Sequence, residues 1–302
     1  MSLKSLTKII KKAFWVALLL LAFGCSKTEN SFEAGFKIVY FSVGHGDSAL
    51  VMCDGHNMMI DCGTSNGIGN LQGVYTYLES NKIDHFDYLV CSHPDTDHYN
   101  GFIDILKKSD GSDRTYDKVL SPVTSYDTNA FNSFAKQYNK GFFDKISKAK
   151  VSNKPMKLGS ADIYILASDS VENKSKTNNR SIVLIIEYQN KRFLFPGDAE
   201  WDLEKFLIDE YDESKLNCDV LKIAHHGSDT STNPSFLYKC SPTYAIFSVS
   251  QDDQCKSIDR LIDYGIDENH FYITDEKGNI TCTIENGRIV FYDTDGKLLN
   301  ND

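Results

Sequence analysis

Four side chains of metal-ligand type lie within six residues of this 302-residue chain. The segment from His93 to His98 has the sequence HPDTDH, so two imidazoles and two carboxylates share one short loop. Burying so many ionisable groups is costly without a neutralising cation, and both kinds of group bind divalent metals. The spacing therefore predicts a metal site. The simpler alternative is a solvated loop in which Asp97 caps the following helix.

An apolar segment with the sequence FDYLVCS, residues 86–92, precedes this loop. It has the pattern of a short strand that is buried on both faces. Pro94 ends that strand because proline has no N–H to donate within a sheet. The ligand-type residues therefore follow the carboxyl end of a strand, which is where open α/β sheets place their sites.

Two further strands are expected to end in residues of the same type. The segment KRFLFPGD, residues 191–198, leads through a Pro-Gly turn to Asp198, although an aspartate in this place is as often a turn or capping residue. The segment DVLKIAHHGS, residues 219–228, ends in His225 and His226. Adjacent strand residues point to opposite faces, so only one of this pair is a ligand unless the turn has already begun.

Taken in order, these motifs resemble those of the metallo-β-lactamase superfamily, and more closely the domain of that fold in ComEC-type competence proteins. The resemblance implies a four-layer αββα sandwich with its site between the loop edges of two sheets. It also implies a metal-dependent hydrolase in which two divalent ions, Zn or Mn, activate a bridging hydroxide. The motifs that carry it are VGHGDS (43–48), MIDCG (59–63), HPDTDH (93–98), NNRS (178–181), FPGD (195–198) and AHHGS (224–228).

The resemblance also assigns roles to individual residues. It makes Asp97, or a neighbouring carboxylate, the group that orients the attacking hydroxide and relays its proton. Asp61 is then a supporting catalytic residue that accepts hydrogen bonds from the ligand loop and orients a histidine. Neutral donors for substrate binding are Asn178, Asn179 and Ser228, with His45 as a further site candidate. The implied metal ligands are His93 and Asp95 for one ion, Asp97, His98 and one of His225 and His226 for the other, and Asp198 as the bridge.

The sequence departs from the general superfamily pattern at three places. Asp95 stands where the HxHxDH signature has its second histidine, as it does in the competence-type subgroup. The motif NNRS occupies the place of a further ligand histidine, so the first metal position is rich in oxygen, which favours manganese or another hard cation in at least one position. His45 replaces the glutamine expected in VGQGDS, and it is either an extra site residue or simply exposed.

The N-terminus has the layout of a bacterial secretory signal. Lysines precede an apolar segment, residues 13–23, and a Gly-Cys pair follows. This pair resembles a lipobox, which makes Cys25 the lipidated first residue of the mature chain. We therefore expect a signal peptide (1–25), a polar tether (26–35) and a hydrolase domain (36–302), exported to the cell envelope and anchored to a membrane, either periplasmic or on the outer surface. Plain cleavage and an uncleaved anchor are the alternatives, although the apolar segment is shorter than the roughly 20 residues of a spanning helix.

The net charge of the chain limits the classes of substrate that we expect. The formal net charge is −10, and DNA binding generally depends on basic contacts, so nucleic acid is possible but not favoured. We expect a phosphodiester-type or other small anionic substrate. The alternatives are a lactonase or β-lactamase-like hydrolase on the same fold, and a non-catalytic binding domain. The complete ligand set argues against the last, because unpaired buried carboxylates are costly.

Strands and helical segments alternate along the chain, which is an α/β pattern. The Asn-Gly pair at 286–287 predicts a hairpin between ITCTI and RIVFY. Cys240 and Cys255, on either side of a strand, could pair, and we assign no cysteine to metal. The expected strands are 37–42, 49–53, 58–61, 88–91, 118–121, 163–167, 182–188, 192–195, 220–224, 245–249 and 271–274, and the clearest helices 73–79, 102–107, 130–138, 201–209 and 257–264.

Overall fold

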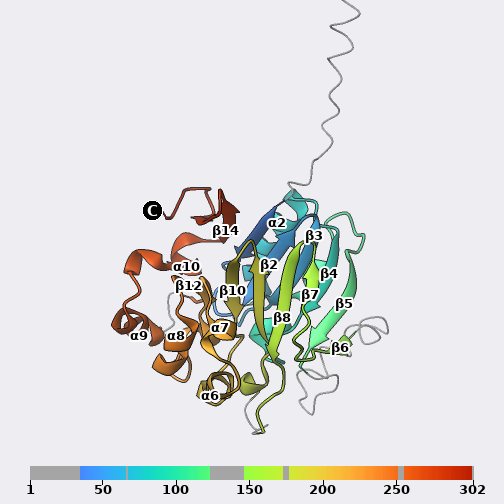
Figure 1. Cartoon of the computed structure of the whole chain (residues 1–302). Helices are drawn as coiled ribbons and strands as arrows, with labels where there is room; N and C mark the ends of the chain where they lie inside the picture. Colours follow the sequence, from blue (N-terminus) through green and yellow to red (C-terminus); the bar gives the residue numbers. More distant parts are fainter. Residues whose placement is uncertain (1–34, 66, 123–145, 173–176, 251–254, 301–302) are drawn as a thin grey trace, which may run out of the picture. The chain divides into compact units, whose positions relative to one another are not determined.

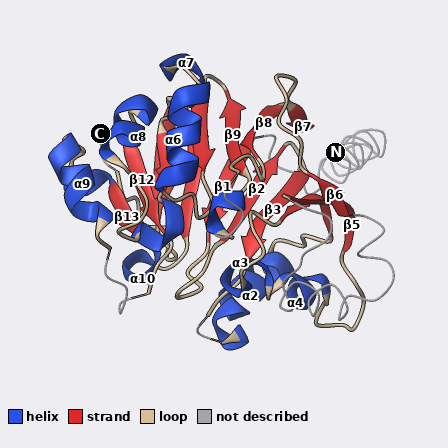
Figure 2. Cartoon of the chain, turned by 90° about the horizontal axis from the view of Figure 1, so that it is seen from below, coloured by secondary structure: helices blue, strands red, loops and turns tan. Residues whose placement is uncertain are grey.

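Two β-sheets pack face to face, and helices cover the outer face of each (Figures 1 and 2). The computed structural model describes residues 35–65, 67–122, 146–172, 177–250 and 255–300. This arrangement confirms the predicted four-layer αββα sandwich, and residues 35–302 form one compact unit. The expected signal peptide, Cys25, nearly all of the tether and the helix over 130–138 lie outside the described residues.

The first sheet has eight strands in the order β15-β14-β1-β2-β3-β4-β5-β6. Neighbours from β3 to β6 are parallel, and the other pairs are antiparallel. The strands are β1 (Phe36–Tyr40), β2 (Ser48–Cys53), β3 (His56–Cys62), β4 (His85–Val90), β5 (Thr115–Ser121), β6 (Ile146–Lys148), β14 (Ile280–Glu285) and β15 (Arg288–Tyr292).

The second sheet has seven strands in the order β13-β12-β11-β10-β9-β8-β7. It too has a parallel half, from β10 to β13, and an antiparallel half. The carboxyl ends of parallel strands lie at one edge of a sheet, so each sheet has an edge to which several loops can bring side chains. The strands are β7 (Met156–Leu158), β8 (Ala161–Ala167), β9 (Val183–Tyr188), β10 (Lys191–Phe195), β11 (Val220–Lys222), β12 (Tyr244–Phe247) and β13 (Phe271–Ile273).

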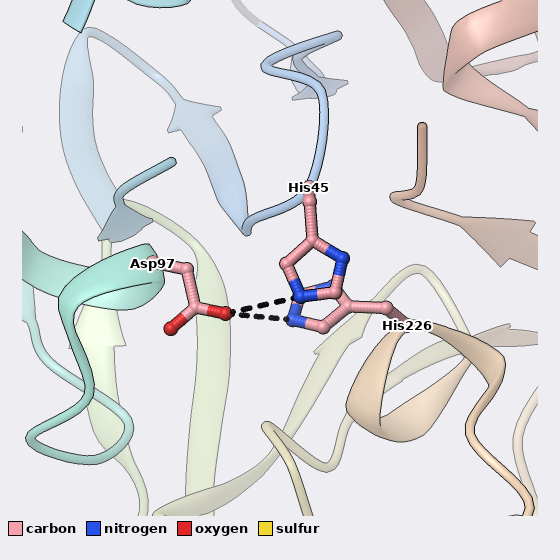
Figure 3. A group of neighbouring side chains, drawn as sticks. All are labelled: His45, Asp97 and His226. Carbon is pink, nitrogen blue, oxygen red and sulfur yellow. Dashed lines mark ion pairs between the residues drawn. The ribbon is translucent and has the colours of Figure 1, made fainter. Parts of the chain in front are cut away.

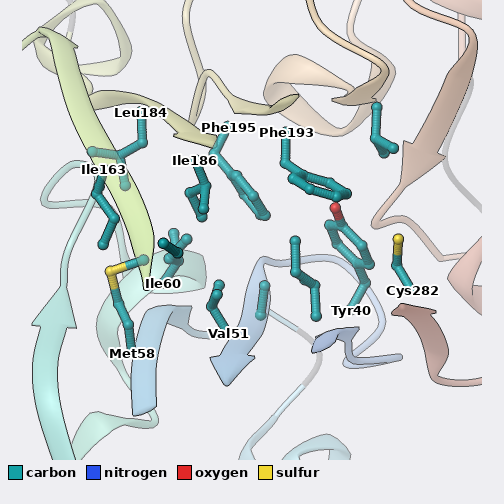
Figure 4. Packing of buried hydrophobic residues seen from close by; sticks show 14 of the residues in the cluster. Tyr40, Val51, Met58, Ile60, Ile163, Leu184, Ile186, Phe193, Phe195 and Cys282 are labelled. Carbon is teal, nitrogen blue, oxygen red and sulfur yellow. The ribbon is translucent and has the colours of Figure 1, made fainter. Parts of the chain in front are cut away.

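The main core lies between the two sheets, and Figure 4 shows side chains of the two sheets meeting there. Alternation along the strands builds it, since successive side chains point to opposite faces. Phe193 and Phe195 of β10 enter this core, whereas Leu194 between them faces the helices. The ring of Tyr40 in β1 stacks against that of Phe195, with 5.6 Å between centroids. Such aromatic contacts fix the spacing of the sheets beneath the loops.

Helices close the two outer faces. Buried side chains of α2 and α4 pack on the first sheet, and those of α6, α8 and α9 pack on the second. No helix within the described ranges is both long and apolar enough to cross a membrane. The helices are α2 (Gln72–Ser80), α3 (Thr96–Tyr99), α4 (Phe102–Leu106), α6 (Trp201–Glu210), α7 (Glu213–Leu216), α8 (Pro234–Cys240), α9 (Ser257–Tyr264) and α10 (Thr274–Lys277), with 3-10 turns η1 (Ile68–Leu71), η3 (Asn178–Arg180), η4 (Ala224–Gly227) and η5 (Glu268–His270).

Every expected strand is present, with bounds that differ by a few residues. The hairpin is confirmed: Glu285 pairs with Arg288, and Asn286 and Gly287 have φ values of 51° and 77°, as a type I′ turn requires. The short strands β6 and β7 and helix α8 were not predicted.

The predicted pairing of Cys240 with Cys255 is wrong, because no disulfide joins them. Cys240 is the last residue of helix α8 and is buried in the core between the second sheet and its helices. Cys255 instead lies beside the turn that carries His226, with its Sγ 3.9 Å from the His226 carbonyl oxygen. Both side chains contact the same hydrophobic cluster, yet both thiols are free.

Glu204 supplies a test of this packing. It is buried on α6 and accepts backbone N–H bonds from Thr232 (2.5 Å) and Asn233 (2.8 Å). Burial raises the pKa of Glu204 from 4.5 to about 7, although the N–H donors oppose the shift. The folded state therefore holds a proton that the unfolded state releases, so the free energy of unfolding falls as pH rises through this interval, by up to about 3 kcal/mol.

Urea denaturation of Glu204→Gln in the presence of EDTA, between pH 4.5 and 8, should show a correspondingly weaker fall in stability than wild type. Glu210→Gln, at the exposed end of the same helix, should retain the wild-type slope. Identical slopes for wild type and Glu204→Gln would contradict the assigned titration.

Candidate metal centre

Loops from both sheets meet at one end of the sandwich and bring all the predicted ligands together. In the first sheet these loops follow the carboxyl ends of β1, β3 and β4, and in the second those of β10 and β11. The residues they contribute are His45 and Asp47 after β1, Asp61 at the end of β3, His93, Asp95, Asp97 and His98 after β4, Asp198 after β10, and His225 and His226 after β11.

A single carboxylate oxygen, Oδ2 of Asp198, lies at the middle of this group. The Asp198 side chain is 4% exposed, and those of His93 and His98 are fully buried. Four imidazole nitrogens thus surround one buried oxygen within 4 Å. The distances from Asp198 Oδ2 are 3.3 Å to His98 Nε2, 3.7 Å to His93 Nε2, 3.7 Å to His226 Nε2 and 3.9 Å to His225 Nε2.

Several of these atoms have no hydrogen-bond partner among the described residues. They are Nε2 of His93, His98 and His226 and Oδ1 of Asp198, all of them buried. A buried polar atom left unsatisfied costs about 1–3 kcal/mol, and four in one cluster need a common explanation. Imidazole nitrogens and carboxylate oxygens that face a shared space form a donor set for a divalent cation. The residues present therefore fit a metal.

Six of the donors form two groups with no shared member, and the ligand atoms of each group lie within 4.8 Å of one another. One is His93, His98 and Asp198, and the other is His45, Asp97 and His226. Figure 3 shows the second, in which Nε2 of His45 and Nε2 of His226 face the same oxygen of Asp97. The geometry places His98 with His93, whereas the resemblance gives it to the other ion with Asp97, and that assignment remains a prediction.

The side of the cluster open to solvent is formed by Asp95 and His225. Asp95 is 40% exposed, lies 3.6 Å from His93 Nε2 and accepts a hydrogen bond from the Thr177 hydroxyl (3.1 Å). Nε2 of His225 lies 3.2 Å from the Asn178 side-chain nitrogen. Burial lowers the pKa of His225, against the opposing charge of Asp198, so this imidazole is neutral and able to bind a cation.

Both adjacent histidines approach Asp198 because the strand has already ended. β11 stops at Lys222, and His225 and His226 lie in the turn η4 with φ values of 49° and 50°. This left-handed conformation is unfavourable for a residue with a Cβ by about 1–2 kcal/mol, and such strain is concentrated at functional sites. The strict alternation that would separate the two rings does not apply.

Asp61 has the contacts expected of a residue that supports the ligands. It accepts hydrogen bonds from the Ser92 backbone N–H (2.7 Å) and hydroxyl (2.6 Å), and its Oδ2 lies 2.9 Å from His98 Nδ1. Burial would lower the pKa of His98, but the charges of Asp198 and Asp61 raise it well above its usual value.

A buried ion pair beneath the cluster escaped the sequence analysis. Lys222 Nζ lies 2.6 Å from Asp47 Oδ1 and donates to the Ile223 carbonyl at 2.9 Å. Asp47 Oδ1 is also 3.5 Å from Nδ1 of His226. The available signal was a lysine within a strand of apolar residues, which is unusual unless the charge is paired. Its partner lies in the loop between β1 and β2 of the other sheet, too distant in sequence to identify.

The residues predicted to bind substrate differ in their distance from the mouth of the site. Asn178 faces His225 at the mouth of the site, and Ser228 lies 3.2 Å from the Thr230 hydroxyl in the turn after it. Asn179 is buried, and its side-chain oxygen accepts N–H bonds from Glu200 (3.0 Å) and Leu203 (3.3 Å), which anchors the start of α6. Substrate binding by these residues remains a prediction.

Comparison with known proteins agrees with this geometry. The family model described as "Metallo-beta-lactamase superfamily" matches residues 42–250. The chain belongs to the metallo-beta-lactamase superfamily. It is a metal-dependent hydrolase of that superfamily, which confirms the family and the class of enzyme predicted from the motifs.

Curated relatives include competence proteins. The chain is 26% identical to "Competence protein ComA" of Neisseria gonorrhoeae over 234 residues, which cover 78% of this chain and 30% of that protein. It is 24% identical to "Recombination protein 2" of Haemophilus influenzae over 233 residues, 76% of this chain and 26% of that one. The chain thus spans less than a third of either relative.

A solved structure shares the fold of this metallo-beta-lactamase domain. The metallo-beta-lactamase fold protein YhfI of Bacillus subtilis superposes with a TM-score of 0.53 at 13% identity. The superposition covers 82% of this chain and 99% of YhfI, so the architecture agrees over almost the whole of that protein.

The backbone of the ligand loop (residues 93–98) lies in close contact with Gly63. A Cβ on Gly63 would overlap the carbonyl carbon of Asp97 and the amide nitrogen of His98. Gly63→Ala should therefore displace both ligands, lower metal affinity more than about 10-fold and reduce stability by about 1–3 kcal/mol. Isothermal titration with Zn or Mn and urea denaturation measure the two effects.

Gly73→Ala, in helix α2, is the matched control, because its new Cβ would lie 3.8 Å from the nearest atom, Asn279 Oδ1. It should retain metal affinity and gain up to about 1 kcal/mol of stability from helix propensity. Unchanged metal affinity in Gly63→Ala would show that the loop does not hold the ligands in the described position.

Proposed function

We propose that this chain is a dinuclear metal-dependent phosphodiesterase of the bacterial cell envelope. The observation that carries the proposal is the ring of four imidazole nitrogens around Asp198 Oδ2. One central carboxylate with donors on both sides suits a bridge between two ions, and paired ions suit in-line displacement at phosphorus.

In this proposal Asp198 separates two sets of donors. One position takes His93 and Asp95, with His225 nearby, and the other takes Asp97, His98 and His226. When bound, the two ions would acidify a water molecule and neutralise the negative charge that develops on the substrate. Asp95 makes the first position richer in oxygen, which supports manganese there, while zinc suits a position richer in nitrogen.

In this proposal, other residues near the mouth of the site orient the attacking water and bind the substrate. Burial would raise the pKa of Asp97, but the neighbouring His226 and His45 imidazoles outweigh it and hold this pKa well below its usual value. Asp97 is therefore a carboxylate at neutral pH and can orient an attacking water by accepting its hydrogen bond. Thr177 beside Asp95 and Asn178 beside His225 are neutral donors, and in this proposal they hold an anionic substrate oxygen.

The names of the relatives support a phosphodiester substrate. "Competence protein ComA" and "Recombination protein 2" share this domain with the chain, but most of their length has no counterpart here. The net charge of −10 opposes tight binding of duplex DNA, which needs many basic contacts. We therefore propose a small phosphodiester or an envelope polymer as the substrate, with nucleic acid as a secondary possibility.

The proposed location rests on the N-terminal sequence. Lipidation of Cys25 would anchor the chain in a membrane, and residues 26–35 would form a polar tether to the hydrolase domain. The competence-type relatives are consistent with a cell-envelope association. Export places the site where polymers and nucleotides of the envelope are accessible.

Elemental analysis of the full-length chain, with turnover of bis-p-nitrophenyl phosphate, tests the activity. We expect two metal ions per chain and turnover that requires added Mn or Zn. Asp198→Asn should lose metal and reduce turnover more than about 100-fold. Mutation of a residue that only hydrogen-bonds to a metal ligand typically lowers metal affinity or activity about 10–100-fold, and loss of a bridging ligand should have a larger effect. Asp202→Asn, on the exposed side of α6, should match wild type.

Two outcomes would overturn this proposal. Metal-dependent hydrolysis of nitrocefin or a lactone without phosphodiester turnover would indicate a lactonase or β-lactamase-like enzyme. A chain that binds no metal after loading with Mn, Zn or Co would be a binding domain.

Metabolic labelling with radioactive palmitate tests the anchor. Wild-type chain expressed in a bacterium should incorporate label and sediment with membranes, and Cys25→Ala should do neither. Ser31→Ala, within the same tether, should behave as wild type. Label that persists in Cys25→Ala would exclude this cysteine as the lipidation site.

A further inference from the structure

We infer that His45 is a ligand of the second metal ion, together with Asp97 and His226. The inference rests on the proposed dinuclear site and adds a donor at a position where the competence-type motif has glutamine. It makes the two metal positions chemically different.

The backbone holds the His45 loop directly on the Asp97 backbone. The Asp47 N–H donates to the Asp97 carbonyl at 3.0 Å, and the Ser65 N–H donates to the His45 carbonyl at 2.7 Å. Gly46 has a φ of 155°, and a Cβ there would lie 2.8 Å from the Asp97 carbonyl oxygen. This close approach requires glycine, and it fixes the position of the neighbouring imidazole relative to the ligand loop.

The side chains then converge on one oxygen. Nε2 of His45 lies 3.4 Å from Asp97 Oδ2, and Nε2 of His226 lies 3.5 Å from the same atom. The two rings are 4.5 Å apart between centroids. Figure 3 shows both Nε2 atoms on the side that faces Asp97. Two nitrogens and a carboxylate oxygen, each from a different loop, form a three-donor set open to a further ligand.

Burial supports a cation rather than a simple hydrogen-bonded trio. His226 is almost fully buried, its Nδ1 lies 2.9 Å from the Ser248 carbonyl, and its Nε2 has no hydrogen-bond partner among the described residues. The Ser248 contact assigns the ring proton to Nδ1, which leaves the Nε2 lone pair directed toward Asp97 and His45. A histidine whose far nitrogen is held by a carbonyl is the usual arrangement in a metal site.

The donor chemistry predicts a difference between the two positions. With His45, the second position gains an imidazole and suits zinc or cobalt, whereas Asp95 keeps the first position richer in oxygen. Glutamine at residue 45 would offer an amide oxygen, which is a harder donor and a weaker ligand for these ions.

Titration of the metal-free full-length chain with Co²⁺ alone, followed by visible absorption and calorimetry, tests the inference without reference to activity. We expect two binding steps in wild type. His45→Gln should weaken the step at the second position about 10–100-fold and change its absorption spectrum, while the other step stays the same. Proton NMR of the Co²⁺-loaded chain should lose one shifted imidazole N–H resonance in this variant.

His56→Gln is the control, because His56 is a half-exposed histidine at the start of β3 and should leave both steps unchanged. Circular dichroism of the metal-free variants checks that each is folded. Two Co²⁺ ions bound with wild-type affinity and spectra in His45→Gln would overturn the inference and leave the proposed function intact. Failure of the wild-type chain to bind Co²⁺ would overturn both.

Discussion

Four imidazole nitrogens around one buried carboxylate oxygen are the arrangement on which the rest of the structure depends. Asp198 lies at the centre of a cluster in which three histidine nitrogens have no hydrogen-bond partner among the described residues. Burial would raise the pKa of Asp198, but the charges of His98, His226 and His93 hold it well below its usual value. The carboxylate of Asp198 in turn raises the pKa of His98. Such a cluster is unfavourable unless many contacts hold its members in place, and the fold provides them at the joined edges of two sheets.

Parallel strands of both sheets place the loops that carry the ligands. β4 in one sheet and β10 and β11 in the other end at the same level, and the core between the sheets fixes their separation. Close backbone contacts then replace side-chain packing within the site. Gly63 and Gly46 allow the loops to touch the backbone of Asp97, and the left-handed turn at His225 and His226 directs both rings inward. The Asp47–Lys222 pair joins the two sheets directly beneath the cluster. Rigidity of this kind holds ligands in place before a metal binds, which reduces the ordering that binding requires.

The sequence predicts most of this because strand ends and ligand-type residues are local signals. HPDTDH, FPGD and AHHGS each follow an apolar segment, and all three reach the site. The strands β6 and β7 were missed because three residues are too few to show alternation. Helix α8 was missed because its seven residues give little periodicity, although Asn233 and Pro234 form a recognisable start signal. The Asp47–Lys222 pair and the contact of His45 with Asp97 depend on which loops meet across the two sheets, and local patterns carry no information about such meetings. The Cys240–Cys255 prediction failed for the same reason.

Anomalous diffraction from crystals of the Mn- or Zn-loaded chain, recorded on both sides of the metal absorption edge, would locate the bound ions relative to Asp198. We expect two anomalous peaks, about 3.5–4 Å apart as in two-metal hydrolytic sites, with the Asp198 carboxylate between them. A single peak, or peaks that do not contact Asp198, would contradict a dinuclear centre bridged by this residue.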